Sequence, residues 1–549
     1  MSTRKNIRNI LVTTALPYAN APLHLGHILE HTQSDIWVRY QRLIGNRCVF
    51  VCADDAHGTP IMLKANELNI EPETLIKEMY QNHVNTFNLY NISHDNYHTT
   101  HSKENQILSE RIFNSLNNNG LIESKKIEQL FDTAKKMFLS DRYVRGACPK
   151  CSAKDQYGDN CEVCGSTYEA TELIEPISVL TNTKPIIKES EHLFFKLSTL
   201  KRKIVNWLRN SRIQTPVHNK LEEWLKEELK DWDISRDSPY FGFEIPGFKN
   251  KYFYVWLDAP IGYLASHMNY LNKQKSDKFE EFWDKGSNSE IYHFIGKDIV
   301  YFHTLFFPAM LAESDFKTPS GVFVHGFLTL EGQKMSKSRG NFISAEEFIS
   351  VIDAEYLRYY FASKLSTGVD DIDLNLEDLR QKVNSDLVNK FVNIASRSAK
   401  FINNDFNSQL SKNVDEDLLD EFIKTSEDIS LMYENLELSK VVKELMKLAD
   451  KANQYVDKMQ PWILIKEEKN ADLVHQICST AINLFRILAI MLQPITPQLA
   501  EKAYSFLNDD PDWNSIHKPL VEHKINKFTP LILRLEENQI DQLMEFKNA

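Results

Sequence analysis

Short apolar runs alternate with longer amphipathic stretches over the first two-thirds of the chain. Residues 9–14 and 48–53 are rich in β-branched and other apolar side chains, and each run is short, which predicts buried strands. Residues 291–298 and 321–327 have the same character and predict two more strands. Between the first two runs, apolar residues recur at roughly helical spacing from Ile28 to Leu43. Strands that alternate with helices predict a parallel sheet in an α/β domain.

Three other regions depart from this alternation. From about residue 116 helical periodicity weakens and turn residues cluster, which indicates an insertion. Residues 251–263 are aromatic and strand-like, and Pro260 and Gly262 favour a loop there, whose aromatic side chains would line a pocket. From about residue 366 apolar residues keep helical spacing nearly to the end, which predicts a helix bundle.

Composition limits the class of protein only loosely. The 549 residues carry 64 Lys+Arg against 76 Asp+Glu, a net charge of −12, which is the wrong overall sign for a nucleic-acid binder. Local basic faces remain, although each is more simply a solvated helix face. The chain starts without an apolar signal segment, and we find no run of 18 or more apolar residues, so we expect a soluble, cytoplasmic protein with no membrane contact. Cys48, Cys52 and Cys478 are then expected to be free buried thiols.

The stretch from Pro17 to His27 joins the first predicted strand to the first predicted helix. A helix N-terminus attracts anionic phosphate, Gly26 would let a ligand approach the backbone, and His24 and His27 are potential donors to phosphate oxygens. Neither GxxxxGK[ST] nor GxGxxG occurs in the chain. We therefore predict a nucleotide-binding enzyme. Residues 27–31 also fit H-x-x-E-H, a zinc-peptidase pattern, but that alternative explains neither the proline turn nor the lysine motif below.

Two CxxC knuckles lie at the centre of the insertion. Cys148 and Cys151 are followed after nine residues by Cys161 and Cys164. Four thiolates at this spacing can surround one Zn²⁺, and a complete set of four sulfur ligands leaves no position for a reactive water. We predict one structural zinc ion. Disulfides are the remaining alternative, which the absence of a secretory signal disfavours.

The His24-Leu25-Gly26-His27 signature, together with Lys334-Met335-Ser336-Lys337-Ser338 about 300 residues later, resembles the two signatures of class I aminoacyl-tRNA synthetases. Residues 9–365 as a whole resemble the methionine-specific branch of that family. The resemblance implies that methionine is activated by ATP and Mg²⁺ and then transferred to tRNA(Met), initiator and elongator. The insertion, about 120 residues long, is too short for the separate editing domain found in the family members specific for isoleucine, valine and leucine.

The resemblance also implies roles for individual residues. His24, His27, Lys334 and Lys337 would be catalytic, and the ATP site would include Gly26, Gly296, Asp298 and Lys337. Asp55 would hold the substrate ammonium in a methionine pocket formed with Leu16, Tyr18, Trp256, Ala259, Pro260, Tyr263, Ile299 and His303. Asn393, Arg397 and Trp462 match positions that read the CAU anticodon. From the residues alone, Asp55 could equally cap the helix that starts near Pro60, and His303 and Trp462 could be core residues.

These patterns predict a Rossmann-like parallel-sheet catalytic domain with a zinc-knuckle insertion, followed by an all-α domain. The expected divisions are 1–115 and 241–325 for the two halves of the nucleotide-binding fold, 116–240 for the insertion, 326–385 for the KMSKS loop and stem-contact region, and 386–549 for the α-helical anticodon-binding domain. Because no oligonucleotide-binding fold follows, we expect a monomer. Two alternatives remain: a synthetase for another apolar amino acid or for cysteine, and a noncatalytic tRNA-binding protein on the same fold.

Overall fold

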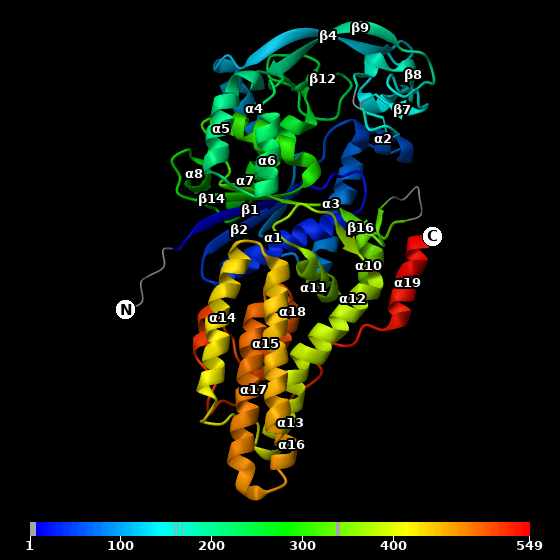
Figure 1. The fold of residues 1–549 in the computed structure, drawn as a ribbon. Coiled ribbons are helices and arrows are strands. Elements are labelled where there is room, and N and C mark those ends of the chain that lie inside the picture. Colours follow the sequence, from blue (N-terminus) through cyan, green and yellow to red (C-terminus); the bar gives the residue numbers. More distant parts are fainter. Residues whose placement is uncertain (1–6, 159, 162, 167, 336–340, 549) are drawn as a thin grey trace.

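An α/β part and a long helical bundle lie end to end in the protein (Figure 1). The computed structural model describes residues 7–158, 160–161, 163–166, 168–335 and 341–548. The insertion rises from the α/β part on the side away from the bundle, and helix α19 (Glu537–Asn548) returns to the α/β part near α10 (Ala345–Val351).

A parallel sheet of six strands in the order β10-β15-β14-β1-β2-β3 forms the centre of the α/β part. Its strands are β1 (Asn9–Thr14), β2 (Arg47–Asp54), β3 (Asn96–Thr99), β10 (Arg212–Ile213), β14 (Glu290–Gly296) and β15 (Gly321–His325). The four strands expected from the apolar runs are confirmed. β10 precedes residue 240 in the chain and already belongs to this sheet.

Helices cover both faces of the sheet, with α1 (Leu25–Leu43) packed on one face and α7 (Val255–Lys273) on the other. The other helices of the α/β part are α2 (Thr59–Leu68), α3 (Pro72–Leu89), α4 (Lys103–Asn118), α5 (Lys201–Asn210), α6 (Thr215–Trp224), α8 (Phe279–Trp283), α9 (Phe307–Ala312), α10 and α11 (Ala354–Lys364). Side chains alternate between the faces along each strand. Accordingly, Ile10 and Val12 belong to the core shared with α1, whereas Leu11 belongs to the core shared with α4 and α7.

The prediction of a loop within residues 251–263 is wrong, because residues 255–263 form the start of helix α7. Pro260 lies inside the helix, where it removes a backbone donor, and glycine lowers helix propensity. Packing explains why the helix forms: a Cβ on Gly262 would lie 2.8 Å from Thr100 Cγ2 and 2.9 Å from Leu16 Cδ1. Gly262 thus allows α7 to approach the ends of the strands, and this tertiary contact overrides local propensity.

The insertion is built on an antiparallel pair, β4 (Ile122–Asp132) and β9 (Ile186–Phe195), which register from Ile122 opposite Phe195 to Phe131 opposite Ile186. β5 (Met137–Phe138) and β11 (Trp232–Asp233) extend this sheet. A second small sheet, β7-β6-β8, carries the cysteine knuckles; its strands are β6 (Val144–Ala147), β7 (Gln156–Tyr157) and β8 (Ile174–Ser178). β12 (Ser235–Asp237) pairs with β13 (Lys251–Phe253) and leads back into α7.

A third small sheet, β17-β16-β18, precedes the bundle and consists of β16 (Leu328–Leu330), β17 (Gln333–Lys334) and β18 (Ile372–Leu374). The predicted bundle is confirmed. It comprises α12 (Leu376–Lys382), the π-helical segment η7 (Val383–Val392), α13 (Asn393–Asp405), α14 (Glu416–Glu434), α15 (Leu438–Met459), α16 (Pro461–Leu464), α17 (Ala471–Leu492) and α18 (Pro497–Leu507).

Residues Glu468–Leu492, which include α17, are long and apolar enough on average to cross a membrane by length and composition. The most apolar stretch of this segment is 83% buried inside the protein. α17 is accordingly the central helix of the bundle, in contact with α13, α14, α15 and α18.

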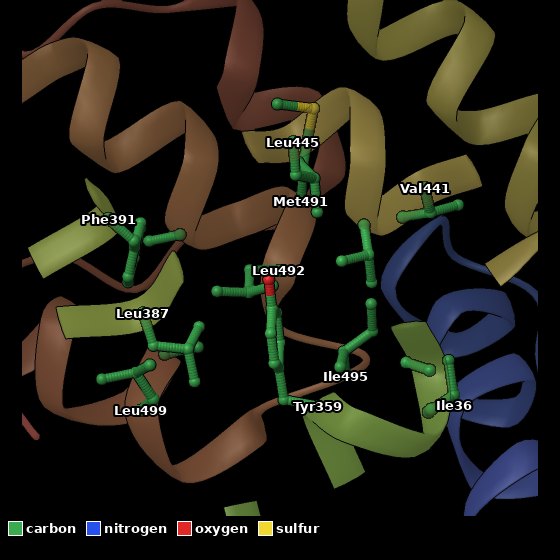
Figure 2. Packing of buried hydrophobic residues seen from close by; sticks show 14 of the residues in the cluster. Ile36, Tyr359, Leu387, Phe391, Val441, Leu445, Met491, Leu492, Ile495 and Leu499 are labelled. Atoms are coloured by element: carbon green, nitrogen blue, oxygen red, sulfur yellow. The ribbon is translucent and has the colours of Figure 1, made fainter. Parts of the chain in front are cut away.

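One hydrophobic core runs from the sheet into the bundle without a break. The same cluster contains Val12 of β1, Ile36 of α1 and Leu492 of α17. Figure 2 shows Ile36 of α1 close to Ile495, which follows α17, and Tyr359 of α11 among residues of η7, α15 and α17. The two parts of the molecule therefore share a packed interior.

A buried ion pair lies at the same junction. Arg358 of α11 donates to Asp35 of α1 at 2.7 Å, and neither side chain is exposed to solvent. The guanidinium also donates to the carbonyls of Ile495 at 3.0 Å and Pro494 at 3.2 Å, just beyond α17. Burial alone would raise the pKa of Asp35, but Arg39 and Arg358 hold it below its ordinary value.

We expect Arg358→Met to destabilise the protein by about 3–5 kcal/mol, because it leaves the buried Asp35 carboxylate and two buried carbonyls without this donor. The free energy of unfolding from chemical denaturation measures the loss. Lys364→Met, on the same helix but in a partly exposed pair with Asp378, is the control and should cost about 1 kcal/mol or less. A loss in Arg358→Met no larger than in the control would contradict this role.

Candidate active site

A cavity of about 700 Å³ opens at the carboxyl ends of the parallel strands. β1 has β14 on one side and β2 on the other, and the chain leaves these strands in different directions. In open α/β sheets, ligands bind at this kind of crevice. Residues after β1, β2 and β14 line the cavity, together with α1, α7 and the segment before α9.

Most of the site residues expected from the sequence meet in this one cavity. Those that line it are Leu16, Tyr18, His24, Gly26, His27, Asp55, Trp256, Ala259, Pro260, Tyr263, Gly296, Asp298, Ile299, His303 and Lys334. Lys334 is exposed at the end of β17. Lys337 lies outside the described residues.

His24 and His27 form a stacked pair at the N-terminus of α1, with ring centroids 3.7 Å apart. The Nδ1 atom of His24 accepts from the Gly26 amide at 3.1 Å, and the Nδ1 atom of His27 accepts from the His24 amide at 3.2 Å. A neutral ring whose Nδ1 accepts carries its proton on Nε2. Burial and the neighbouring His24 lower the pKa of His27 well below its ordinary value, so His27 is neutral near pH 7.

Gly26 serves the histidine pair directly. A Cβ at Gly26 would lie 2.9 Å from Nδ1 and Cε1 of His24. The glycine therefore makes room for the His24 ring to fold back over the helix N-terminus, a reason that differs from the ligand approach expected from the sequence.

Asp55 is a buried carboxylate on the cavity wall. Backbone bonds hold it in place: its amide donates to Pro17 O and its carbonyl accepts from the Ala19 amide, both at 2.8 Å. It is not a helix cap, because Gly58 occupies the N-cap position of α2. Burial and the nearby Asp258 raise its pKa well above the ordinary value.

The Oδ1 atom of Asp55 is buried and has no hydrogen-bond partner among the described residues. A buried carboxylate oxygen without a partner is costly, and a cationic donor bound in the cavity would remove that cost. Asp55 is therefore suited to bind an ammonium group.

Aromatic rings form the wall beside α7. Trp256 stacks on Phe302 with centroids 3.9 Å apart and planes inclined by 8°. The Tyr263 hydroxyl lies 2.7 Å from Nε2 of His303, whose Nδ1 lies 3.1 Å from the carbonyl of Ile299. His303 therefore donates through Nδ1 and accepts from Tyr263 through Nε2, and burial lowers its pKa to about 4. A neutral imidazole and aromatic rings suit an apolar or thioether side chain.

Several cavity residues escaped sequence reasoning. Arg236 is the middle residue of β12, opposite Tyr252 of β13, and its guanidinium lies 3.7 Å from the centroid of the Tyr254 ring. Glu30 of α1 lies 3.2 Å from His325, which ends β15. Asp141 and Arg142 reach the cavity from the insertion. No local sequence pattern predicts that these residues line the cavity, because contacts between segments distant in the sequence bring them there.

The H-x-x-E-H pattern does not form a metal site. His27 faces the cavity, Glu30 contacts His325, and His31 contacts His94 at 3.1 Å on the other side of the helix turn. The three side chains of the pattern thus have separate partners.

The four cysteines of the insertion come together as predicted. Their sulfur atoms lie within 4.8 Å of one another, with Cys148 and Cys164 3.8 Å apart and Cys151 and Cys161 3.6 Å apart. Two sulfurs on a tetrahedral zinc with bonds of about 2.3 Å are separated by roughly 3.8 Å. A disulfide requires about 2.05 Å. The cluster can therefore hold one metal ion, and its residues fit zinc.

The three predicted anticodon residues lie along one seam between η7–α13 and α15–α16. Asn393 donates to Asn453 at 3.1 Å, and Arg397 pairs with Asp457. The Arg397 guanidinium also lies 4.9 Å from the centroid of the Trp462 ring. Trp462 is 37% exposed, so it is a surface residue and not a core residue. The seam offers amide, guanidinium and aromatic groups side by side.

Comparisons with known proteins agree with this arrangement. Residues 10–399 match the family described as tRNA synthetases class I (M), and residues 415–548 match the anticodon-binding domain of tRNA ligase. The fold is similar to that of Mycobacterium tuberculosis methionyl-tRNA synthetase in complex with methionyl-adenylate, with a TM-score of 0.80, 22% identity, and coverage of 96% of this chain and 99% of that chain. The apo form of the Mycobacterium tuberculosis enzyme gives a TM-score of 0.73 and 21% identity, with coverage of 97% and 99%.

Burial of His303 predicts that the stability of the folded protein depends on pH. The pKa of His303 is about 4 in the folded protein and about 6.5 in an unfolded chain, so below pH 6.5 the unfolded state binds a proton that the folded state does not. Stability should fall as the pH falls from about 6.5 towards 4, and His303 should contribute about 2 kcal/mol of that loss by pH 5.

Unfolding free energies at pH 7 and pH 5 test this. The loss on acidification should be smaller by about 2 kcal/mol in His303→Gln than in the unmodified protein. His517→Gln changes an exposed histidine and is the control, with the loss expected to be unchanged. Equal losses in both variants would show that His303 is not the group responsible.

Proposed function

Because the chain belongs to the family described as tRNA synthetases class I (M), we propose that it is a methionine–tRNA ligase. It would activate methionine with ATP to methionyl-adenylate and pyrophosphate, and then transfer methionine to the 3′-terminal adenosine of tRNA(Met), initiator and elongator. The observation that carries the proposal is the Asp55 carboxylate, whose Oδ1 has no hydrogen-bond partner among the described residues, beside an aromatic pocket and a histidine pair at a helix N-terminus.

Asp55 would bind the ammonium of methionine, and the thioether would extend towards Trp256, Tyr263 and His303. Sulfur interacts favourably with aromatic ring edges. Leu16, Tyr18, Ala259, Pro260 and Ile299 complete the proposed pocket. An apolar pocket separates side chains that differ by one methylene by only about 1–3 kcal/mol, so shape and the Tyr263–His303 pair would have to reject competitors.

In the first step, a methionine carboxylate oxygen attacks the α-phosphorus of ATP and pyrophosphate leaves. His24 and His27 would donate through Nε2–H to phosphate oxygens at the N-terminus of α1, where the helix dipole also favours negative charge. Gly26, Gly296 and Asp298 would contact the nucleotide. Lys334 and Lys337 would meet the charge that develops in the transition state.

The second step needs no protein nucleophile, because the tRNA hydroxyl attacks the carbonyl of the adenylate and AMP leaves. The protein would act by positioning and electrostatics. Asn393, Arg397 and Trp462 would read the anticodon at the far end of the bundle, with stacking and planar hydrogen bonding as the means of recognition.

Two metal ions belong to the proposal. Zinc would be held by Cys148, Cys151, Cys161 and Cys164 and would stabilise the knuckles. Magnesium would bind with ATP and offset the charge of the leaving pyrophosphate. We further propose that the protein acts as a cytoplasmic monomer.

Asp55→Asn tests the ammonium site. The amide keeps the shape of the side chain but loses the charge, and a hydrogen bond to a charged group contributes about 1.5–3 kcal/mol. We expect the KM for methionine in ATP–pyrophosphate exchange to rise about 10- to 100-fold with a smaller change in kcat. Asp155→Asn, in the exposed part of the insertion, is the control. An unchanged KM in Asp55→Asn would contradict the proposal that Asp55 binds the ammonium group of methionine.

Trp462→Ala tests the anticodon seam. Loss of base stacking, worth about 1–3 kcal/mol, should raise the KM for tRNA(Met) in aminoacylation by about 5- to 100-fold, while exchange without tRNA stays the same. Ile463→Ala removes the neighbouring exposed side chain on the same short helix and should have little effect. Equal effects in both variants would count against stacking on Trp462.

A further inference from the structure

A second group of metal-ligating side chains lies behind the candidate active site. It consists of His31 on α1, Cys52 on β2 and His94 in the turn before β3. One ligand atom from each of the three lies within 4.8 Å of the others. None of the three lines the cavity, and the proposed chemistry uses none of them.

The two imidazoles already have the spacing that a metal ion requires. Nδ1 of His31 and Nε2 of His94 are 3.1 Å apart, and the ring planes are nearly perpendicular at 87°. Two nitrogens on a tetrahedral zinc with bonds of about 2.0 Å are separated by roughly 3.3 Å. Thr14 adds an oxygen, since its Oγ1 lies 3.4 Å from Nδ1 of His31. One sulfur and two nitrogens thus lie close together, and a hydroxyl oxygen lies near one of the nitrogens.

Buried and aromatic side chains surround the cluster. His31 and Cys52 have no exposed surface. The His31 ring stacks on Phe87 with centroids 4.1 Å apart, and the centroids of the Phe50 and His94 rings are 4.4 Å apart.

Two acidic side chains near the cluster could balance the charge of an ion. The electrostatic influence of Glu30 and Asp54 acts on the Cys52 thiol, and both side chains are buried. Asp54 Oδ2 has no hydrogen-bond partner among the described residues. A divalent ion bound to one thiolate would leave one positive charge next to these carboxylates, which lessens the cost of placing the ion in the interior.

We propose that His31, Cys52 and His94 form a second zinc site, separate from the four-cysteine cluster. On binding, the Cys52 thiol would lose its proton to solvent. The proton shared between His31 Nδ1 and His94 Nε2 would move to the other nitrogen of the ring that carries it, so that both nitrogens could bind Zn²⁺ with the Cys52 sulfur. The borderline softness of zinc matches this mixed set of ligands. The ion would fix α1 to β1 and β2 one helical turn beyond His27, and so stabilise the floor of the cavity.

The zinc content of the full chain, measured by elemental analysis after equilibration with zinc and removal of loose ions, tests the proposal. We expect two ions per chain in the unmodified protein and one in each of Cys52→Ala and His94→Phe. Cys48→Ala, which changes a buried cysteine of the same strand outside the cluster, is the matched control and should keep two. One ion in the unmodified protein, or two in both ligand variants, would overturn the proposal.

X-ray absorption at the zinc edge of the unmodified protein gives a test that needs no variant. With both sites filled, the average first shell contains imidazole nitrogen as well as sulfur. The four-cysteine cluster alone gives sulfur only. A shell of sulfur alone at full zinc loading would contradict a second site, whether or not the variants fold.

Discussion

The buried pair of Asp35 and Arg358 is the constraint on which the two parts of the molecule depend. Asp35 lies near the middle of α1, the helix whose N-terminus carries His24 and His27. Arg358 holds that carboxylate and, at the same time, the carbonyls of Pro494 and Ile495 beyond α17. Breaking such a pair leaves a charge in the interior, so α1 and the bundle keep one relative position. The cavity and the seam between α13 and α15–α16 are therefore held at a defined distance by packed structure.

The chemistry proposed for the cavity follows from the hydrogen bonding of Asp55 and the protonation of His27 and His303. Among the described residues, one buried oxygen of Asp55 has no hydrogen-bond partner, and His27 and His303 are neutral because burial lowers their pKa values. Such a site binds a cation at one point and presents neutral donors at another. The side chains that line the cavity are suited to orient two substrates and to stabilise charge on a phosphate, and adenylate formation requires both.

The sequence predicted those features whose signal is local. The apolar runs located four strands of the main sheet, the CxxC pairs located the cysteine cluster, and the histidine signature located the start of α1. The helix at residues 255–263 could not be predicted, because Pro260 and Gly262 argue against a helix and only the contacts of Gly262 with Leu16 and Thr100 explain it. Arg236 and His325 enter the cavity through strand pairing across distant segments, and no local pattern reports such pairing. The Lys337 prediction falls outside the described residues, so it rests on its motif.

ATP–pyrophosphate exchange without tRNA, measured with each of the twenty amino acids separately, tests whether this cavity activates methionine. We expect exchange with methionine alone. Exchange with isoleucine, valine, leucine or cysteine in its place would assign another substrate to the same fold, and no exchange from folded, zinc-replete protein would contradict adenylate chemistry and favour a noncatalytic tRNA-binding protein.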